Sequence, residues 1–177
     1  MTYMSVDDKI RTHLANGQLI QVTPEFDGDR IVRQLFVHQE AWSFIKPEEP
    51  HHAIISEERA QRAIEDLLRF VDGSRIICAR EPFDKPANTY LMPIHSEGRG
   101  VWAIRNRDVP HIRFFGLFPK VDTFVVTYAC LRADLDSKEM WEQIRTEAVA
   151  IYSELFPNSL PEYERNASHV CTNIILV

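Results

Sequence analysis

Residues 100–132 of the chain, GVWAIRNRDVPHIRFFGLFPKVDTFVVTYACLR, decide the fold. The stretch holds three runs rich in β-branched and aromatic residues, GVWAIR, HIRFFGLF and DTFVVTYACL, which are separated by NRDVP and PKV. Runs of this composition favour β-strands. Their connections are too short for the helical crossovers that parallel strands need, so the three strands are predicted to form an antiparallel meander.

Two amphipathic helices flank this strand-rich region. Over residues 57–71, apolar side chains recur at the spacing of one helical stripe, Ser56 is placed to cap the first turn, and Gly73 is placed to end the helix. A second helix is predicted over residues 137–156, where DSKE resembles a capping box. The apolar faces of both helices are expected to pack into the core.

The remaining segments predict a short helix and several short strands. Ser5, followed by two aspartates, indicates the start of a helix, and residues 19–23 and 30–38 look extended. The apolar C-terminal segment SHVCTNIILV predicts docking on the sheet edge or pairing with another chain. We therefore expect an α+β fold of one domain, residues 1–177, with a curved antiparallel meander and helices packed on one face.

The composition describes a globular protein without need of a metal or a disulfide. The chain has 177 residues, of which 45% are hydrophobic, and its 20 basic and 26 acidic side chains give a net charge of −6. A chain of this length can bury a sizeable core, and it lacks the continuous apolar run of a membrane span. The N-terminus lacks the features of a signal peptide, so a cytoplasmic location is expected. The acidic balance counts against non-specific binding of nucleic acid.

Several enzyme classes lack their signature. The sequence contains no phosphate-binding G-x-x-x-x-G-K-[ST] loop, no dinucleotide-binding G-x-G-x-x-G after a strand, no H-E-x-x-H and no G-x-S-x-G. His38 and Glu40 match the H-x-E of zinc deaminases, but no P-C-x-x-C follows to supply thiolate ligands. The neighbouring His51 and His52 cannot easily share one ion, and Cys130 is expected to be buried on a strand. No metal and no cofactor is expected.

A basic and aromatic cluster on the meander remains. Six of the 20 lysines and arginines, with one histidine, fall within a fifth of the chain: Arg99, Arg105, Arg107, His111, Arg113, Lys120 and Arg132. Alternation along the strands puts Arg105 and Arg113 on one face, which Tyr128 could join. The opposite face is the expected core and holds Trp102, Ile104, Ile112 and Phe114.

Such a face suits a phosphate, because arginine presents a fork of donors and stays charged. In metal-free RNA cleavage the 2′-hydroxyl attacks the adjacent phosphorus, and fixed positive donors stabilise the charge on the non-bridging oxygens. A nearby histidine or tyrosine can move the proton. The competing interpretation is that these arginines are exposed strand residues paired with acidic side chains elsewhere.

The order of elements and three short motifs resemble the RelE/HigB-type toxins, which are ribosome-dependent mRNA endonucleases, and their phage-derived relatives. In that family a G-l-[WY]-E-[LI]-R strand precedes a y-R-[ILV]-[LF]-[YF] strand and then an apolar strand that ends in h-G-F-x-K-K. The first motif is matched by Gly100, Trp102, Ile104 and Arg105, with Ala103 at the acidic position. Residues 111–115 match the second, and Arg132 stands where the third has paired lysines.

The resemblance covers residues 30–156 and implies a toxin-like core between an N-terminal extension, 1–29, and a β-rich tail, 157–177. It implies that Arg105, Arg113 and Arg132 contact or stabilise RNA phosphate. The first hypothesis is therefore a metal-independent mRNA endonuclease. In it Arg113 and Arg105 hold the scissile phosphate, His111 or Tyr128 transfers the proton, and the side chains that bind the rest of the substrate are Arg107, Arg132 and Lys120.

The second hypothesis is a non-catalytic interaction domain, a phage or mobile-element protein that uses the same sheet to grip a protein partner. The acidic total favours this hypothesis, whereas the local basic cluster favours the first. The partners to consider are RNA or the ribosome, an antitoxin or another protein, and a second copy of the chain. No membrane partner is expected.

Overall fold

The computed structural model describes residues 4–26, 28–46, 53–80, 88–94, 100–162 and 167–177. In this part of the chain, eight strands form one sheet in the order β1-β2-β7-β6-β5-β4-β3-β8. The centre of the sheet is the antiparallel meander of β5 (Val101–Arg105), β6 (Ile112–Lys120) and β7 (Thr123–Leu131). The predicted α+β class and the predicted meander are both confirmed.

The outer strands come from segments on both sides of the meander in sequence. They are β1 (Leu19–Gln21), β2 (Gln34–His38), β3 (Ile76–Cys78), β4 (Leu91–Pro93) and β8 (Ile174–Leu176). β2 runs parallel to β7, and β3 runs parallel to both β4 and β8, so the sheet is mixed rather than wholly antiparallel. The C-terminal segment lies on the sheet edge as β8, which was one of the two predicted alternatives.

The helices are α1 (Val6–Ala15), α2 (Gln39–Ile45), α3 (Glu57–Val71) and α4 (Lys138–Leu155), with 3₁₀ turns at Arg132–Asp134 and Ala167–His169. Ser5, Ser56 and Ser137 cap α1, α3 and α4, because each side chain accepts a backbone N–H of the first turn. The sequence did not predict α2, which follows directly on β2. None of the helices in the described residues is long and apolar enough to cross a membrane.

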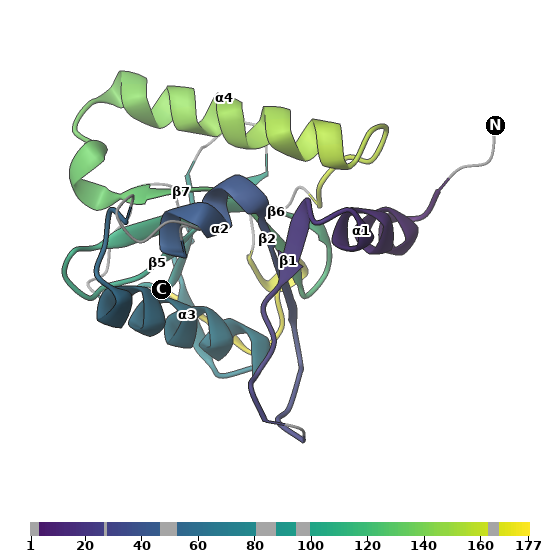
Figure 1. Ribbon diagram of the computed structural model, residues 1–177, viewed down its shortest axis with the longest axis horizontal. Coiled ribbons are helices and arrows are strands. Elements are labelled where there is room, and N and C mark those ends of the chain that lie inside the picture. The colour runs from purple at the N-terminus through teal and green to yellow at the C-terminus, as the bar shows by residue number, and fades with distance from the viewer. Residues whose placement is uncertain (1–3, 27, 47–52, 81–87, 95–99, 163–166) are drawn as a thin grey trace.

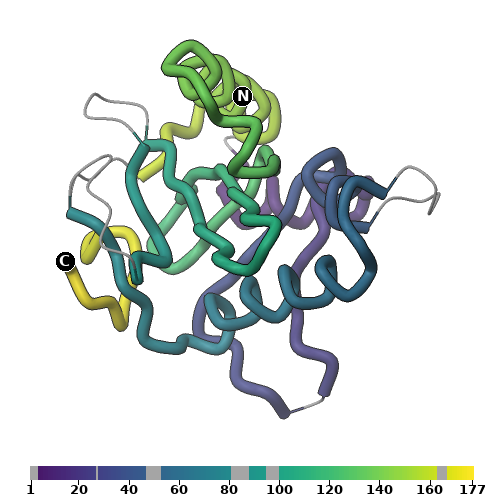
Figure 2. Tube along the Cα trace, turned by 90° about the vertical axis from the view of Figure 1, so that its left-hand side faces the viewer, coloured from purple at the N-terminus to yellow at the C-terminus, as the bar shows by residue number. Residues whose placement is uncertain are grey.

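The prediction that helices pack on one face of the sheet is wrong, because both faces are covered. α4 lies on one side of the sheet, and α3 lies on the other side together with α2 (Figures 1 and 2). Trp102 and Phe114 pack in the core that includes residues of α2 and α3, whereas Ala103 and Phe115 pack in the core that includes residues of α1 and α4. β6 is apolar at successive positions, so helices must shield both of its faces from water.

A shift in register shapes the middle of the meander. Phe115 pairs with Tyr128 but the next residue, Gly116, pairs with Val126, so β7 holds one extra residue at this point. A Cβ atom at Gly116 would lie 2.2 Å from the carbonyl oxygen of Val125. The close approach of the two strands therefore requires glycine at position 116.

Arg33 is a structural residue in the core. Its side chain is fully buried, its Nη1 donates to the Phe70 carbonyl at 3.0 Å, and its Nη2 donates to the Thr172 carbonyl at 2.6 Å. Its Nε lies 3.7 Å from a carboxylate oxygen of Asp122. One guanidinium thus joins the start of β2 to the end of α3, the β6–β7 turn and the C-terminal segment.

Candidate functional site

Three arginines come together where the strands of the meander end. Arg105 closes β5 and pairs in register with Arg113 on β6, which in turn pairs with Cys130 on β7. Arg132 directly follows the last residue of β7. We call Arg105, Arg113 and Arg132 the arginine triad. Strand alternation predicted correctly that Arg105 and Arg113 share a face of the sheet.

Arg113 is the buried member of the triad, with 7% of its surface exposed. Its Nη1 donates to the carbonyls of Asn106 (3.3 Å) and Ile112 (2.9 Å), and no ion pair to it is found among the described residues. Burial, followed by repulsion from Arg105 and Arg132, lowers the pKa of Arg113 to about 10. The cluster would therefore gain from a bound anion.

The other two members, Arg105 and Arg132, lie in different surroundings. Burial lowers the pKa of Arg105, and Arg107 and Arg132 lower it further. Arg132 is held at its place by three contacts: its backbone N–H donates to the His111 carbonyl at 2.7 Å, its Nη1 donates to the Leu135 carbonyl at 2.8 Å, and its guanidinium lies 5.9 Å from the ring centre of Trp141. His111 before β6, Leu135 ahead of α4 and Trp141 in the first turn of α4 thus position Arg132.

The two candidates for proton transfer lie in different surroundings. His111 is exposed and adjoins the triad, because its carbonyl accepts the Arg132 N–H. Tyr128 is half-buried on β7, with its ring centre 6.4 Å from that of Phe115, and burial raises its pKa. A raised pKa keeps the phenol protonated at neutral pH, so Tyr128 is suited to donate a proton rather than to accept one.

Cys130 lies on β7 between Tyr128 and Arg132 in sequence, but it is not a reactive thiol. It is 5% exposed, and burial, followed by the charge of Asp134, raises its pKa to about 12. The prediction of a buried cysteine on a strand is confirmed, and its chemistry is that of a small apolar side chain.

Not all of the predicted basic cluster is brought together. Lys120 ends β6 seven residues beyond Arg113, about 23 Å along an extended strand, and its Nζ pairs with Asp7 of α1 at 2.5 Å. Lys120 is therefore not part of the triad's surface, and the structure does not bring it together with the other two side chains predicted to bind the substrate, Arg107 and Arg132. Residues 47–52 and 95–99 lie outside the described residues, and with them His51, His52 and one member of the predicted basic cluster, Arg99.

Arg107 faces a polar cleft next to the triad, which we call the arginine cleft. The cleft has a volume of about 680 Å³ and lies between α3 and the ends of β3, β4 and β5. Five arginines and three acidic residues line it: Arg62, Arg69, Arg75, Arg105, Arg107, Glu65, Asp66 and Asp108. Three of these arginines, Arg62, Arg69 and Arg75, were not predicted from the sequence. Arg62, Asp66 and Arg69 nevertheless recur at the spacing of one helical face.

A buried polar network fixes the loop between β5 and β6 against α3. Arg59, 4% exposed, donates through Nε to the Pro110 carbonyl at 3.0 Å and through Nη2 to the side-chain oxygen of Asn106. Asn106 in turn donates to Asp66 at 2.8 Å, and Tyr90 Oη donates to the Asp66 carbonyl at 2.7 Å. This network holds Arg105 and Arg107, the residues on either side of Asn106.

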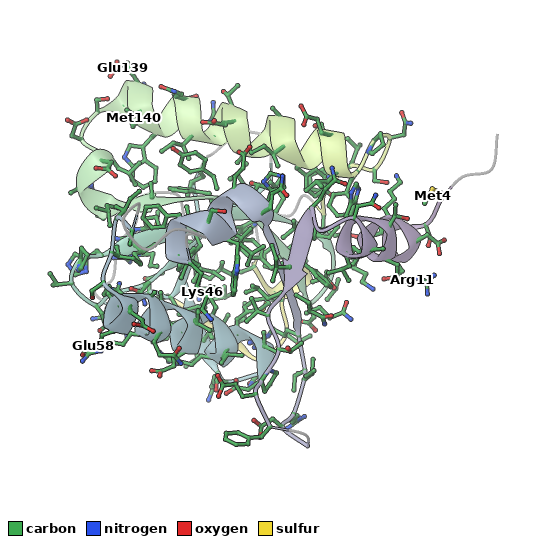
Figure 3. All side chains as sticks on the ribbon, viewed as in Figure 1. Met4, Arg11, Lys46, Glu58, Glu139 and Met140 are labelled. Carbon is green, nitrogen blue, oxygen red and sulfur yellow. The ribbon has the colours of Figure 1, made fainter. Side chains whose placement is uncertain are left out.

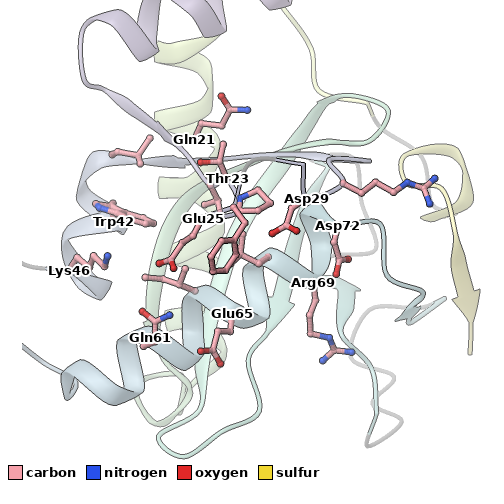
Figure 4. A pocket seen from close by; sticks show the side chains of 17 residues that line it. Gln21, Thr23, Glu25, Asp29, Trp42, Lys46, Gln61, Glu65, Arg69 and Asp72 are labelled. Atoms are coloured by element: carbon pink, nitrogen blue, oxygen red, sulfur yellow. The ribbon is translucent and has the colours of Figure 1, made fainter.

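A second hollow lies beside α3, like the arginine cleft. It is between α3 and the arm that joins β1 to β2 (Figure 4). It has a volume of about 580 Å³ and is partly apolar, with Phe26 on the arm 76% exposed. Figure 4 shows charged side chains of both signs around it, among them Glu25, Lys46 and Asp72. It shares Arg69 and Glu65 with the arginine cleft, so the two hollows adjoin across α3.

Within the described residues, no three histidine, cysteine, aspartate or glutamate side chains gather as metal ligands would. Comparison with protein-family models, with curated proteins and with solved structures gave no match to this chain.

Proposed function

We propose that this chain is a metal-independent RNA endonuclease of the RelE/HigB type that acts at the arginine triad. The observation that supports the proposal is the convergence of Arg105, Arg113 and Arg132 from three adjacent strand ends, with burial and the neighbouring arginines lowering the pKa of Arg113 and of Arg105. A cluster of this kind is destabilised by its own charge and stabilised by a phosphate bound within it.

The triad would act on the charge that develops during cleavage. The 2′-oxygen forms a bond to phosphorus, the bond from phosphorus to the 5′-oxygen breaks, and the products are a 2′,3′-cyclic phosphate and a 5′-hydroxyl. Arg113 and Arg132 donate to the non-bridging oxygens as their negative charge grows. Because Arg113 lies in the protein's interior rather than in water, its interaction with that charge is strengthened.

Two side chains divide the proton transfers in this proposal. His111, exposed beside Arg132, accepts the proton of the 2′-hydroxyl through its imidazole nitrogen. Tyr128, whose pKa is raised, donates the proton that the leaving 5′-oxygen takes up. Water then returns a proton to the phenolate, and His111 releases its proton to solvent.

Expression in bacteria tests the proposed function. Induction of the wild-type chain should arrest growth and fragment cellular mRNA, and the Arg113→Ala variant should do neither at the same protein level. Arg11→Ala is the matched control, because Arg11 lies on α1, far from the N-terminal ends of α3 and α4 marked by Glu58 and Glu139 (Figure 3). Unchanged growth and intact transcripts with the wild-type chain would contradict the proposal.

A second candidate function is protein binding without catalysis, and the partly apolar groove of Figure 4 favours it. The sheet itself offers little room for a partner, since helices cover both of its faces. This candidate predicts that Phe26→Ser, a change on the groove, alters the effect of expression on growth, whereas Arg113→Ala does not. The opposite pattern supports the endonuclease.

A further inference from the structure

The arginine cleft continues directly from the triad. Arg105 belongs to both, since it ends β5 beside Arg113 and also lines the cleft with Arg107. Arg107 is close enough to lower the pKa of Arg105. From this shared residue the cleft runs between α3 on one side and β3 on the other. At this end of β5, Arg105 therefore connects the triad, on the face of the sheet that α4 covers, to the cleft on the α3 side.

The charge in the cleft is positive and only partly compensated. Arg62 pairs with Glu58 outside the cleft, and Arg69 pairs with Asp66. Arg75 and Arg107 are exposed, and among the described residues neither has an ion pair or a hydrogen bond. Two cations thus face the cleft with their donors available to a ligand.

The acidic residues of the cleft are tied down or exposed at its rim. Asp66 accepts from Asn106 at 2.8 Å and pairs with Arg69 at 3.2 Å, and burial raises its pKa. Glu65 and Asp108 are exposed. Five arginines therefore outweigh three acidic residues in the lining of the cleft.

The spread of the arginines indicates the kind of ligand. Arg62 and Arg69 are seven residues apart on α3, which is about 10 Å along a helix, and Arg75 and Arg107 lie on other elements. This span exceeds one phosphate group. The ligand that matches it is a chain with several phosphates, and arginine is the side chain that binds phosphate oxygens bidentately.

We propose that the arginine cleft binds the sugar–phosphate backbone of the single-stranded RNA whose scissile phosphate lies at the triad. The inference rests on the proposed function for the identity of the ligand. Arg75 and Arg107 contact backbone phosphates, and Arg69, held on Tyr90 at 5.7 Å from its ring centre, supports the α3 side. The cleft would thereby set the direction in which the strand crosses the triad.

Binding of a non-cleavable RNA tests this inference. The probe is a fluorescent 2′-O-methyl RNA of 12 nucleotides, titrated at several salt concentrations with the wild-type protein and with Arg75→Ala/Arg107→Ala. Each lost phosphate contact lowers the slope of log affinity against log salt by about 0.7. The double variant should therefore lose about 1.4 from the slope and bind about 10- to 30-fold more weakly at 0.1 M salt.

The matched control is Arg11→Ala/Lys120→Ala, which removes the same charge from exposed positions on α1 and at the far end of β6. It should change the affinity less than about 2-fold at 0.1 M salt. Equal losses in the two double variants would overturn the inference, because binding would then follow net charge alone. Tighter binding of duplex DNA or of an acidic peptide than of the single-stranded RNA would overturn it as well.

The failure of the inference and the failure of the proposed function give different results. If the wild-type protein binds the non-cleavable RNA through Arg75 and Arg107 but cleaves no RNA, the cleft assignment stands and the endonuclease does not. If the wild-type protein cleaves RNA and the double variant binds the probe as the wild type does, the endonuclease stands and the cleft assignment does not.

Discussion

Replacement of Arg113 by methionine should stabilise the protein while it removes the proposed phosphate site. Burial and two neighbouring arginines lower the pKa of Arg113 from 12.5 to about 10. That difference corresponds to about 3 kcal/mol by which folding disfavours the charged guanidinium. At neutral pH the group is protonated in both the folded and the unfolded chain, so the whole penalty is present there.

Methionine keeps a long side chain but removes the charge and two hydrogen bonds. The bonds to the Asn106 and Ile112 carbonyls are worth about 1 kcal/mol each, and the Ile112 carbonyl keeps the N–H of Asn106 as a second donor. The net effect of Arg113→Met is a gain of about 1 kcal/mol in the free energy of unfolding. For a chain of this size the midpoint of thermal unfolding should rise by about 2–4 °C.

Urea denaturation followed by tryptophan fluorescence measures this change, read as a shift in midpoint at constant slope. The comparison is Arg33→Met, which removes an equally buried arginine that has an acidic partner and carbonyl acceptors. That variant should lose about 3–5 kcal/mol, because Asp122 and the acceptors are left without it. A loss of 2 kcal/mol or more in Arg113→Met would refute the reasoning, since it would show that the guanidinium is well compensated.

Three further predictions concern other parts of the molecule. Inorganic phosphate at about 100 times its Kd should stabilise the wild-type protein by about 2.7 kcal/mol and leave Arg113→Met unaffected in thermal unfolding. Burial lowers the pKa of His38 below its usual 6.5, so the unfolded chain takes up a proton first as the pH falls and stability is lost below about pH 6.5. His38→Gln should remove this part of the pH dependence of unfolding, and an unchanged curve would contradict the assignment. Gly116→Ala should cost about 2–3 kcal/mol through its clash with the Val125 carbonyl, whereas Gly17→Ala, which meets nothing within 4 Å but has a φ of +71°, should cost about 1 kcal/mol in the same measurement.

Local patterns in the sequence were sufficient to predict α1, α3, α4 and the faces of the strands. α3 spans the predicted residues 57–71 because its apolar stripe, its serine cap and its terminal glycine all agree. The alternation of β5 and β6 placed Trp102 and Phe114 on one face and Ala103 and Phe115 on the other. Each of these features depends on residues that are close together in the chain.

The layers of the fold could not be predicted from local patterns, because they depend on contacts between segments that are distant in the chain. Helices were predicted on one face of the sheet only, although FFGLF in β6 is apolar at successive positions, which is the pattern of a strand covered on both sides. α2 was missed because it is short and follows a strand without a break. The burial of Arg33 depends on carbonyls up to 140 residues away along the chain, which no local pattern indicates.

The candidate site was predicted in part. Strand pairing was enough to bring Arg105 to Arg113, whereas Lys120 lies at the other end of the same strand, a separation that the length of β6 implies. The arginine cleft depends on how α3 lies against β3 and β5, and that packing is set by the tertiary structure. The cover that α4 places over the triad's face of the sheet was also not visible in the sequence.

The central claim is that the arginine triad supports cleavage of RNA at a phosphodiester bond. The most direct test is incubation of the purified protein with an end-labelled mRNA, in EDTA and with or without ribosomes, followed by analysis of the fragment ends. The claim predicts fragments with 2′,3′-cyclic phosphate and 5′-hydroxyl ends from the wild-type protein, and at least 100-fold slower cleavage, about 2.7 kcal/mol in the barrier, from Arg113→Met. Cleavage at the wild-type rate by Arg113→Met, or no cleavage by the wild-type protein in either condition, would contradict it.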